Sequence, residues 1–328
     1  MKTFKKLVKE FEYYINIEKN YSFKTSRTYL NNLRDFEKYI EEYNVFNNLL
    51  IENINKDHIK NYLMHLKINR SNKATTINNK ISTLKSFYGF LSGKSYISAE
   101  DNITTDLRHQ KLPKILPIYL TYEEAETLLL GTKLLSNNST RDYAILCTYL
   151  LTGARLSEIV NLEIEQISFS NKTILLMGKG SKERTVPMVE RVENSLKEYL
   201  NTNINNNIIK PRCSSVDTKV IFLNKYGRPI SERGMQEIVV SLMKKTGVYK
   251  QGLSTHKLRH TCFTLLHRSG VDILKIQQMA GHENIKSTAI YTHLNEKDLY
   301  QSMQKNPLNA NGYTKELINK IKDKYTKK

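Results

Sequence analysis

The chain has 328 residues, with 51 Lys and Arg against 32 Asp and Glu, which gives a formal net charge of +19. This length is typical of two domains, each able to bury its own core. A composition with 39% hydrophobic and 25% charged residues indicates folded domains and excludes a disordered chain. The strong positive charge favours a polyanionic partner, with nucleic acid ahead of a membrane surface or an acidic protein.

The sequence also argues against export and membrane insertion. No apolar run approaches the ~20 residues that span a bilayer, and the first helix lacks the apolar core of a signal peptide. The three cysteines, Cys147, Cys213 and Cys262, form no CxxC pair and no even framework. This pattern fits a reducing compartment, so we expect a cytoplasmic protein without membrane association.

Apolar residues recur every three or four positions in four segments of the first hundred residues, 4–15, 29–40, 59–66 and 77–91. This spacing predicts amphipathic helices, and together they predict a small helical bundle over residues 1–108. Basic residues lie on the polar faces of these helices: Arg27, Lys60, Lys73, Lys80 and Lys85. Singly, each fits an ordinary solvated helix face; together they suggest one basic surface for DNA phosphates.

A linker is expected over residues 109–118, because Pro113 and Pro117 interrupt the helical pattern and favour an extended backbone. The segment Thr121–Glu124 then matches the Ser/Thr-x-x-Glu capping box that begins a helix. A second domain over residues 119–328 follows.

The pattern along the second domain predicts, in order, a buried helix over 142–151 that ends at Thr152-Gly153, a helix over 154–160, a hairpin over 173–188, a polar loop over 201–217, a short strand over 220–223, helices from 231 onward and a tail helix over 314–322. The fold class is therefore mostly α with a small antiparallel β-sheet.

The Gly-rich turn of the hairpin is not a nucleotide-binding loop. A P-loop needs Gly, four residues and then Gly-Lys-Ser/Thr before a helix, whereas Gly178-Lys179-Gly180 leads into a second strand. What remains is Lys179 at a hairpin tip, reaching outward between two glycines. Taken alone, Lys179 is best interpreted as an ordinary solvated turn lysine.

His256 and His260 share one helix face, which is how zincins place two metal ligands. The zincin pattern also needs Glu after the first His, and the cation of Lys257 stands there instead, so we expect no metal. His256 and Arg259 share a face too, and an imidazole beside a guanidinium suits a phosphate. Arg155, with Glu158 three residues later, reads alone as a surface ion pair.

The ordered set of motifs is more informative than any of its members. In chain order they are TGARLSE (152–158), GKGSKER (178–184), HKLRH (256–260), GH (281–282) and YTHL (291–294). In identity, order and spacing this set resembles the tyrosine recombinase (phage integrase) family, and its motifs look closest to the Xer-type site-specific recombinases. The resemblance covers residues 119–294, and the N-terminal helices are similar to the family's core-binding domain.

The resemblance implies a role for each matched residue. Two arginines would grip the scissile phosphate, Lys179 would protonate the leaving 5′ oxygen, and Tyr291 would be the nucleophile that forms a 3′-phosphotyrosyl link. These two arginines would be Arg155 and Arg259. His256 would assist proton transfer, and His282 would form a hydrogen bond to the phosphate. Further DNA contacts are expected at Lys182, Arg184 and Lys257.

Elementary chemistry supports these roles. A phosphodiester transition state gathers negative charge on its non-bridging oxygens, which preorganised arginines stabilise. A phenol with a reference pKa near ~10 needs a base and a positive pocket before it attacks. Because the covalent intermediate stores the bond energy, resealing needs neither ATP nor a metal ion, so we expect no cofactor.

The implied partner is double-stranded DNA with a specific recombination site, bound as two duplexes by a homotetramer that exchanges strands through a Holliday junction. The resemblance allows for a partner recombinase or a DNA translocase, and it implies that the tail helix docks into a neighbouring protomer.

The compact chain, without an arm-binding domain, favours Xer-like chromosome or plasmid dimer resolution. An integrase or invertase of a phage or transposon stays open, because the 201–217 loop is longer than usual. A type IB topoisomerase-like enzyme, a non-catalytic DNA-binding protein and a metal-dependent enzyme are the remaining alternatives.

Overall fold

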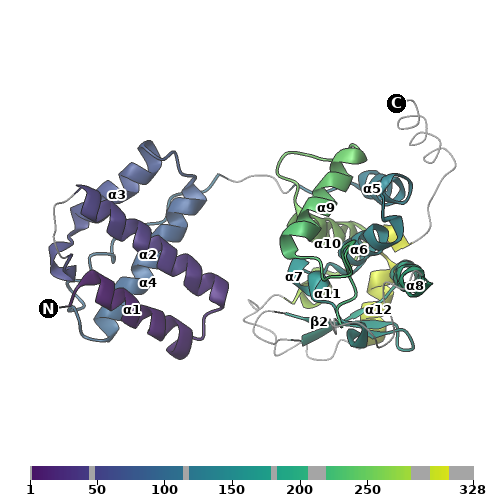
Figure 1. The fold of residues 1–328 in the computed structure, drawn as a ribbon, viewed down its shortest axis with the longest axis horizontal. Helices are drawn as coiled ribbons and strands as arrows, with labels where there is room; N and C mark the ends of the chain where they lie inside the picture. Colours follow the sequence, from purple (N-terminus) through teal and green to yellow (C-terminus); the bar gives the residue numbers. More distant parts are fainter. Residues whose placement is uncertain are drawn as a thin grey trace. The chain divides into compact units, whose positions relative to one another are not determined.

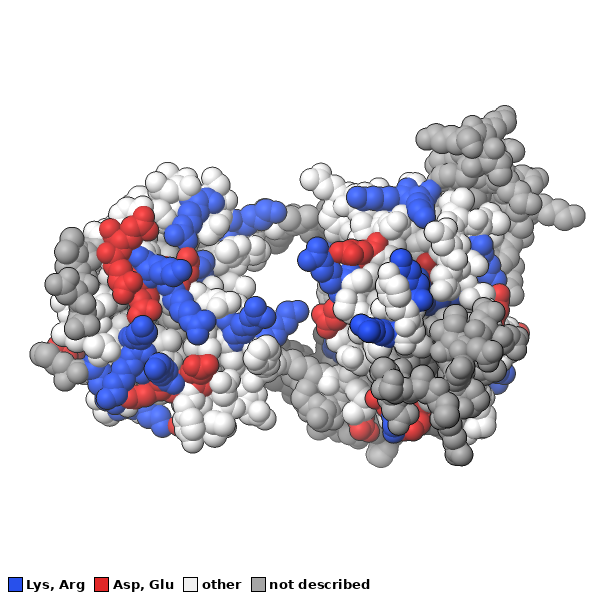
Figure 2. Space-filling model, viewed as in Figure 1, with Lys and Arg blue, Asp and Glu red and all other residues white. Residues whose placement is uncertain are grey.

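The computed structural model describes residues 2–43, 49–113, 118–178, 183–205, 219–281 and 296–309 (Figure 1). The chain divides into two compact units, Met1–Leu116 and Pro117–Lys328, each with its own hydrophobic core. This division falls inside the expected linker segment, 109–118. Lys and Arg side chains lie on the visible face of both units (Figure 2). Among the described helices, none has the length and apolarity needed to cross a membrane.

The first unit is a helical bundle, as the apolar spacing predicts. Its helices are α1 (Phe4–Tyr13), which continues as the π-helix η1 (Tyr14–Glu18), α2 (Phe23–Tyr43), the 3₁₀ turn η2 (Ile51–Asn53), α3 (Lys56–Ile68) and α4 (Ala74–Gly93). Their apolar faces meet in an aromatic core, in which the rings of Phe4 and Phe11 each lie 5.3 Å from that of Phe87 with edge-to-face geometry. The core of the bundle therefore joins side chains from α1 and α4, the first and last α-helices of this unit.

The second unit is built around one buried helix. Its helices are α5 (Tyr122–Leu135), α6 (Ser139–Thr152), α7 (Leu156–Val160), α8 (Glu190–Asn205), α9 (Glu232–Lys245), α10 (Thr255–Arg268), α11 (Ile273–Ala280) and α12 (Glu296–Gln304), with 3₁₀ turns η3 (Ile164–Gln166) and η5 (Pro307–Asn309). Twelve consecutive residues of α6, from Arg141 to Thr152, are buried. Helices α5, α8 and α10 pack around it (Figure 1), which explains why this segment has no polar face.

The ends of two helices confirm local predictions. Thr121 and Glu124 form the expected capping box at the start of α5. Gly153 ends α6 in the left-handed conformation, with a φ of 63°. A Cβ at this position would also come within 2.6 Å of the Phe263 ring, so both backbone and packing require glycine.

The predicted hairpin is present in a three-stranded antiparallel sheet of order β1-β2-β3. The strands are β1 (Ile167–Ser168), β2 (Thr173–Met177) and β3 (Glu183–Pro187), and Met177 pairs with Glu183 at the end next to the turn. The turn residues 179–182 lie outside the described residues, as do residues 206–217 of the predicted 201–217 loop. Residues 201–205 extend α8 instead.

The prediction of a short strand over residues 220–223 is wrong. Val220 and Leu223 form only isolated bridges, to Glu163 and Pro229. The hydroxyl of Tyr199 donates to the Ile221 carbonyl and accepts from the Leu223 N–H. A side chain thus satisfies backbone groups that a neighbouring strand would otherwise pair.

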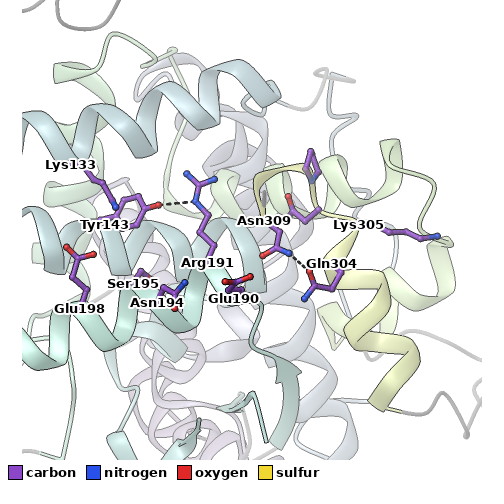
Figure 3. Close-up of a pocket in the computed structure, with 12 residues that line it drawn as sticks. Lys133, Tyr143, Glu190, Arg191, Asn194, Ser195, Glu198, Gln304, Lys305 and Asn309 are labelled. Atoms are coloured by element: carbon purple, nitrogen blue, oxygen red, sulfur yellow. Dashed lines mark hydrogen bonds between the residues drawn. The ribbon is translucent and has the colours of Figure 1, made fainter. Parts of the chain in front are cut away.

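A buried ion pair joins distant parts of the second unit. Arg191 of α8 is 4% exposed, and its guanidinium binds both carboxylate oxygens of Glu126 in α5, at 2.6 and 3.1 Å. It also donates to the Tyr143 hydroxyl at 2.9 Å and to the Leu308 carbonyl. Arg191 and Tyr143 line a pocket of about 420 Å³ between α8 and the segment 304–309 (Figure 3). One side chain therefore ties α5, α6, α8 and η5 together.

We expect Arg191→Met to lower the free energy of unfolding by about 3–5 kcal/mol, because it leaves Glu126 buried without its counter-charge. Urea denaturation of the variant measures this loss. The matched control is Arg233→Met, which removes an exposed pair with Glu237 and should cost less than about 1 kcal/mol. Equal stability of the two variants would contradict the structural importance of the buried pair.

Candidate active site

Arg155 stands at the junction between α6 and α7, two residues after Gly153. Its backbone N–H donates to Oε2 of Glu158 at 2.6 Å, and its Nη1 donates to Oε1 of the same carboxylate at 2.9 Å. Its Nη2 lies 3.4 Å from the Ala280 carbonyl oxygen and 3.3 Å from that of Gly281. The guanidinium is thus held from two sides while the side chain stays 36% exposed.

Arg259 comes from α10 and is almost fully buried. Its Nη1 donates to the Gly153 carbonyl and its Nη2 to the Ala280 carbonyl. Its guanidinium carbon lies 4.9 Å from the centre of the Phe263 ring. Burial, followed by the nearby charges of Arg155 and Arg184, lowers the pKa of Arg259 to about 10. At pH 7 the group stays cationic.

Three arginines from distant parts of the sequence converge on the end of one helix. Arg155, Arg184 and Arg259 all donate to the carbonyls of residues 279–281, where α11 ends. These carbonyls carry the negative end of the helix dipole, so cations are stabilised there. Gly281 closes the helix in the left-handed conformation, with a φ of 59°. The positive charge of the site is therefore anchored on this helix end.

Glu158 is the buried carboxylate of the site, with a side chain that is 0% exposed. Burial raises its pKa, but hydrogen bonds from Arg184 and from Arg155 outweigh burial and hold the pKa at about 2. The interpretation of Arg155 and Glu158 as a surface ion pair is therefore wrong, because the carboxylate lies inside the protein. Glu158 was absent from the predicted site residues, although its position three residues after Arg155 was the signal that could have identified it.

His256 lies in the first turn of α10, one helical turn before His260, and the two rings meet edge to face at 5.4 Å. Burial, followed by the charges of Arg259, Lys257 and Arg155, lowers the pKa of His256. The neutral imidazole is therefore favoured at pH 7, and a neutral ring can accept a proton. Within the described ranges, no group of three or more His, Cys, Asp or Glu is arranged to hold a metal ion.

Three of the six predicted catalytic residues are described and lie together: Arg155, His256 and Arg259. The other three, Lys179, His282 and Tyr291, lie outside the described residues, as does the predicted DNA contact Lys182. The described chain reaches Gly178 on one side of the hairpin turn. It also reaches Gly281, whose carbonyl accepts from Arg155.

The residues predicted to contact DNA divide into two groups. Arg27 and Lys73 are exposed, and Lys85 and Lys257 are half-buried. Lys80 of α4 is only 8% exposed, and its ammonium donates to Asp35 of α2 at 2.6 Å. Arg184 likewise donates to Glu158. The expectation that Lys80 lies on an open polar helix face is therefore wrong. Both Lys80 and Arg184 neutralise a carboxylate within their own unit.

Comparison with solved structures identifies the same fold in DNA-bound proteins. The XerH site-specific recombinase bound to difH substrate aligns with a TM-score of 0.64 and 22% identity, covering 92% of this chain and 84% of that one. The Tn1549 transposon integrase in complex with circular intermediate DNA aligns with a TM-score of 0.68 and 20% identity, covering 92% and 99%.

Sequence comparison reaches closer relatives. Tyrosine recombinase XerC of Caldanaerobacter subterraneus is 35% identical over 260 residues, 79% of this chain and 70% of that protein. Tyrosine recombinase XerC of Oceanobacillus iheyensis is 33% identical over 299 residues, 91% of this chain and 95% of that protein.

Two family models match the chain. The phage integrase N-terminal SAM-like domain matches residues 8–94, and the phage integrase family matches residues 119–298, a range that contains the converging arginines. With more than half of its length matched and XerC proteins among its relatives, the chain belongs to the phage integrase family, the tyrosine recombinases.

Proposed function

We propose that this chain is a Xer-like site-specific recombinase that cleaves and rejoins DNA through Tyr291. The observation that carries the proposal is the convergence of the Arg155 and Arg259 guanidiniums on the end of α11, with His256 three residues before Arg259 on α10 and its pKa lowered by burial and by these charges. This arrangement offers fixed donors to one phosphate, in a chain whose relatives are tyrosine recombinases.

In this proposal the two arginines bind the non-bridging oxygens of the scissile phosphate. Both guanidiniums are held by protein oxygens before DNA arrives, so little reorganisation is needed when the transition state gathers charge. Arg155 is the more open of the two and offers its exposed edge, whereas the buried Arg259 contributes a cation close to the helix end. Among the described residues, Glu158 is the carboxylate that bonds to these arginines, so the three guanidiniums together keep an excess of positive charge.

The chemical step is an exchange of one phosphodiester for another. The Tyr291 oxygen attacks phosphorus and forms a P–O bond to the phenol, while the bond to the 5′ oxygen breaks with its electron pair. His256 is suited to take up the phenolic proton, and Lys179 supplies a proton to the leaving oxygen. Attack by a free 5′-hydroxyl reverses the exchange and reseals the strand. Since one ester replaces another, the reaction consumes no ATP.

The two units would divide the work of holding DNA. We assign residues 1–108 to a core-binding domain and residues 119–328 to the catalytic domain, with the exposed Arg27 and Lys73 among the phosphate contacts of the first. Four copies of the chain would bind two duplexes and exchange strands through a Holliday junction.

Resolution of chromosome or plasmid dimers is the biological role that we propose, because the relatives at 33–35% identity are XerC proteins. A plasmid carrying two directly repeated sites tests this role. Dimer resolution requires deletion of the intervening DNA by the purified protein, alone or with a second recombinase. Recombination that occurs only between a circular element and a separate target would favour an integrase instead.

The Tyr291→Phe variant should form no SDS-resistant protein–DNA adduct and should keep duplex affinity close to that of the unmodified chain, since only the nucleophilic oxygen is lost. Because the target sequence is unknown, duplexes that the variant binds are first selected from a library of randomised sequences. The unmodified chain is then tested for adducts on nicked versions of those duplexes, in the presence of EDTA. The control is Tyr226→Phe, an exposed tyrosine, which should form the adduct normally. An adduct with Tyr291→Phe, or activity that disappears in EDTA, contradicts the mechanism.

Arg155→Ala and Arg259→Ala should each slow adduct formation by at least ~10²-fold, the loss expected when one preorganised donor to a transition-state oxyanion is removed. Single-turnover assays on the selected duplex measure the rate. Thermal unfolding of each variant must accompany the assay, because Arg259 also holds the Gly153 and Ala280 carbonyls. A folded variant that cleaves at the normal rate would show that its arginine does not bind the phosphate.

Duplex affinity should fall by a factor on the order of 10³ between about 50 and about 200 mM salt, because basic side chains release counterions from DNA when they bind phosphates. Titration of the Tyr291→Phe variant with a labelled duplex at several salt concentrations gives the slope. A flat response would contradict phosphate binding by the basic surfaces.

A further inference from the structure

We propose that Arg184 is a positioning residue of the active site, which holds Glu158 so that Arg155 keeps its donors for the phosphate. The proposal rests on the proposed function and adds a residue that touches neither the DNA nor the reacting atoms. The sequence offered Arg184 as a DNA contact, but its side chain is only 14% exposed and is turned toward protein groups.

The contacts of Arg184 form a fork against one carboxylate. Its Nη1 lies 2.5 Å from Oε1 of Glu158 and its Nη2 lies 2.8 Å from Oε2, so both oxygens of the carboxylate are engaged. Bidentate pairing of this kind fixes the plane of a carboxylate as well as its position. The third donor, Nε, binds the Met279 carbonyl at 3.1 Å.

This bidentate pairing determines how many N–H donors of Arg155 the Glu158 carboxylate can accept. Glu158 is fully buried, so it needs cationic donors wherever it finds them. With both oxygens already engaged by Arg184, it receives Nη1 and the backbone N–H of Arg155 but not the Nη2 group. Without Arg184, Glu158 would lose two of its donors and would depend on Arg155 for charge compensation. The Arg155 guanidinium would then turn further toward Glu158 and away from the phosphate.

Arg184 also joins three segments that carry the catalytic residues. It lies on β3, opposite Leu176 of β2, in the hairpin whose turn contains Lys179. Through Glu158 it binds α7, which begins at Arg155, and through Met279 it binds the end of α11. A Cβ at Gly281 would lie 3.3 Å from the Arg184 Cδ, so the Arg184 side chain packs closely against Gly281, the last described residue before His282.

The test compares cleavage with binding in Arg184→Met, which keeps the length of the side chain and removes its donors. We expect adduct formation on the selected nicked duplex to slow by about 100-fold, as for a catalytic group moved by about 1 Å, while duplex affinity changes by less than about 3-fold. Arg184→Lys keeps the charge but not the bidentate pairing, so its rate of adduct formation should lie between those of Arg184→Met and the unmodified chain. Arg268→Met is the control for loss of one arginine, because within the described part of the chain its guanidinium bonds to Tyr119 alone, at the exposed surface, and the variant should cleave normally.

A second variant separates positioning from a merely structural role. In Arg184→Met combined with Glu158→Gln, the neutral amide no longer draws Arg155 away, so cleavage should be at least about 10-fold faster than in Arg184→Met alone. Residues that act through one another are non-additive in this way. If the two substitutions instead multiply their losses, Arg184 does not act through Glu158.

The remaining outcomes are distinguishable. Normal cleavage by Arg184→Met, or a parallel loss of binding and cleavage, overturns the proposal, and the second result restores Arg184 as a DNA contact. If thermal unfolding shows that Arg184→Met does not fold, Arg184→Lys carries the same comparison. Failure of the proposed function gives a different pattern, in which the unmodified chain itself forms no adduct with Tyr291.

Discussion

A single buried carboxylate organises the positive charge of this site. Glu158 would be costly inside the protein if it were alone, and it is stabilised because Arg155 and Arg184 approach it from different segments. The same interaction keeps the arginines in place in the absence of DNA, when like charges would otherwise repel. A strongly positive site thus holds a buried anion among its described residues, and this anion fixes Arg155 and Arg184 relative to each other.

The end of α11 supplies the second half of this arrangement. Its last carbonyls need donors, and the three arginines provide them. Helix dipole and guanidinium charge therefore stabilise each other, and α7, β3 and α10 are brought to one point. The hydrophobic core around α6 explains the stability of the unit, whereas this polar junction explains why arginines up to about a hundred positions apart in the sequence meet at one helix end.

Much of the fold was predictable from the sequence, because it follows local rules. The apolar period over residues 77–91 gave helix α4, the Thr121–Glu124 capping box gave the start of α5, and Gly153 marked the end of α6. Predictions failed where tertiary contacts decide. Lys80 and Arg184 look like open basic residues, yet each binds a carboxylate that is distant in sequence. The spacing of Glu158 marks it as a partner of Arg155, but its burial was not predictable, because nothing near it in the sequence indicates that Arg184 also binds it.

Gly153 has a consequence that extends beyond the turn it makes. Its carbonyl accepts from Arg259, and the space above its Cα is filled by the Phe263 ring, which lies against the same guanidinium. A residue without a side chain therefore acts as a spacer that sets how deeply a cation sits in the protein. Any methyl group there would displace the ring first and the arginine next. The active site is consequently sensitive to steric change at a position that has no functional group to lose.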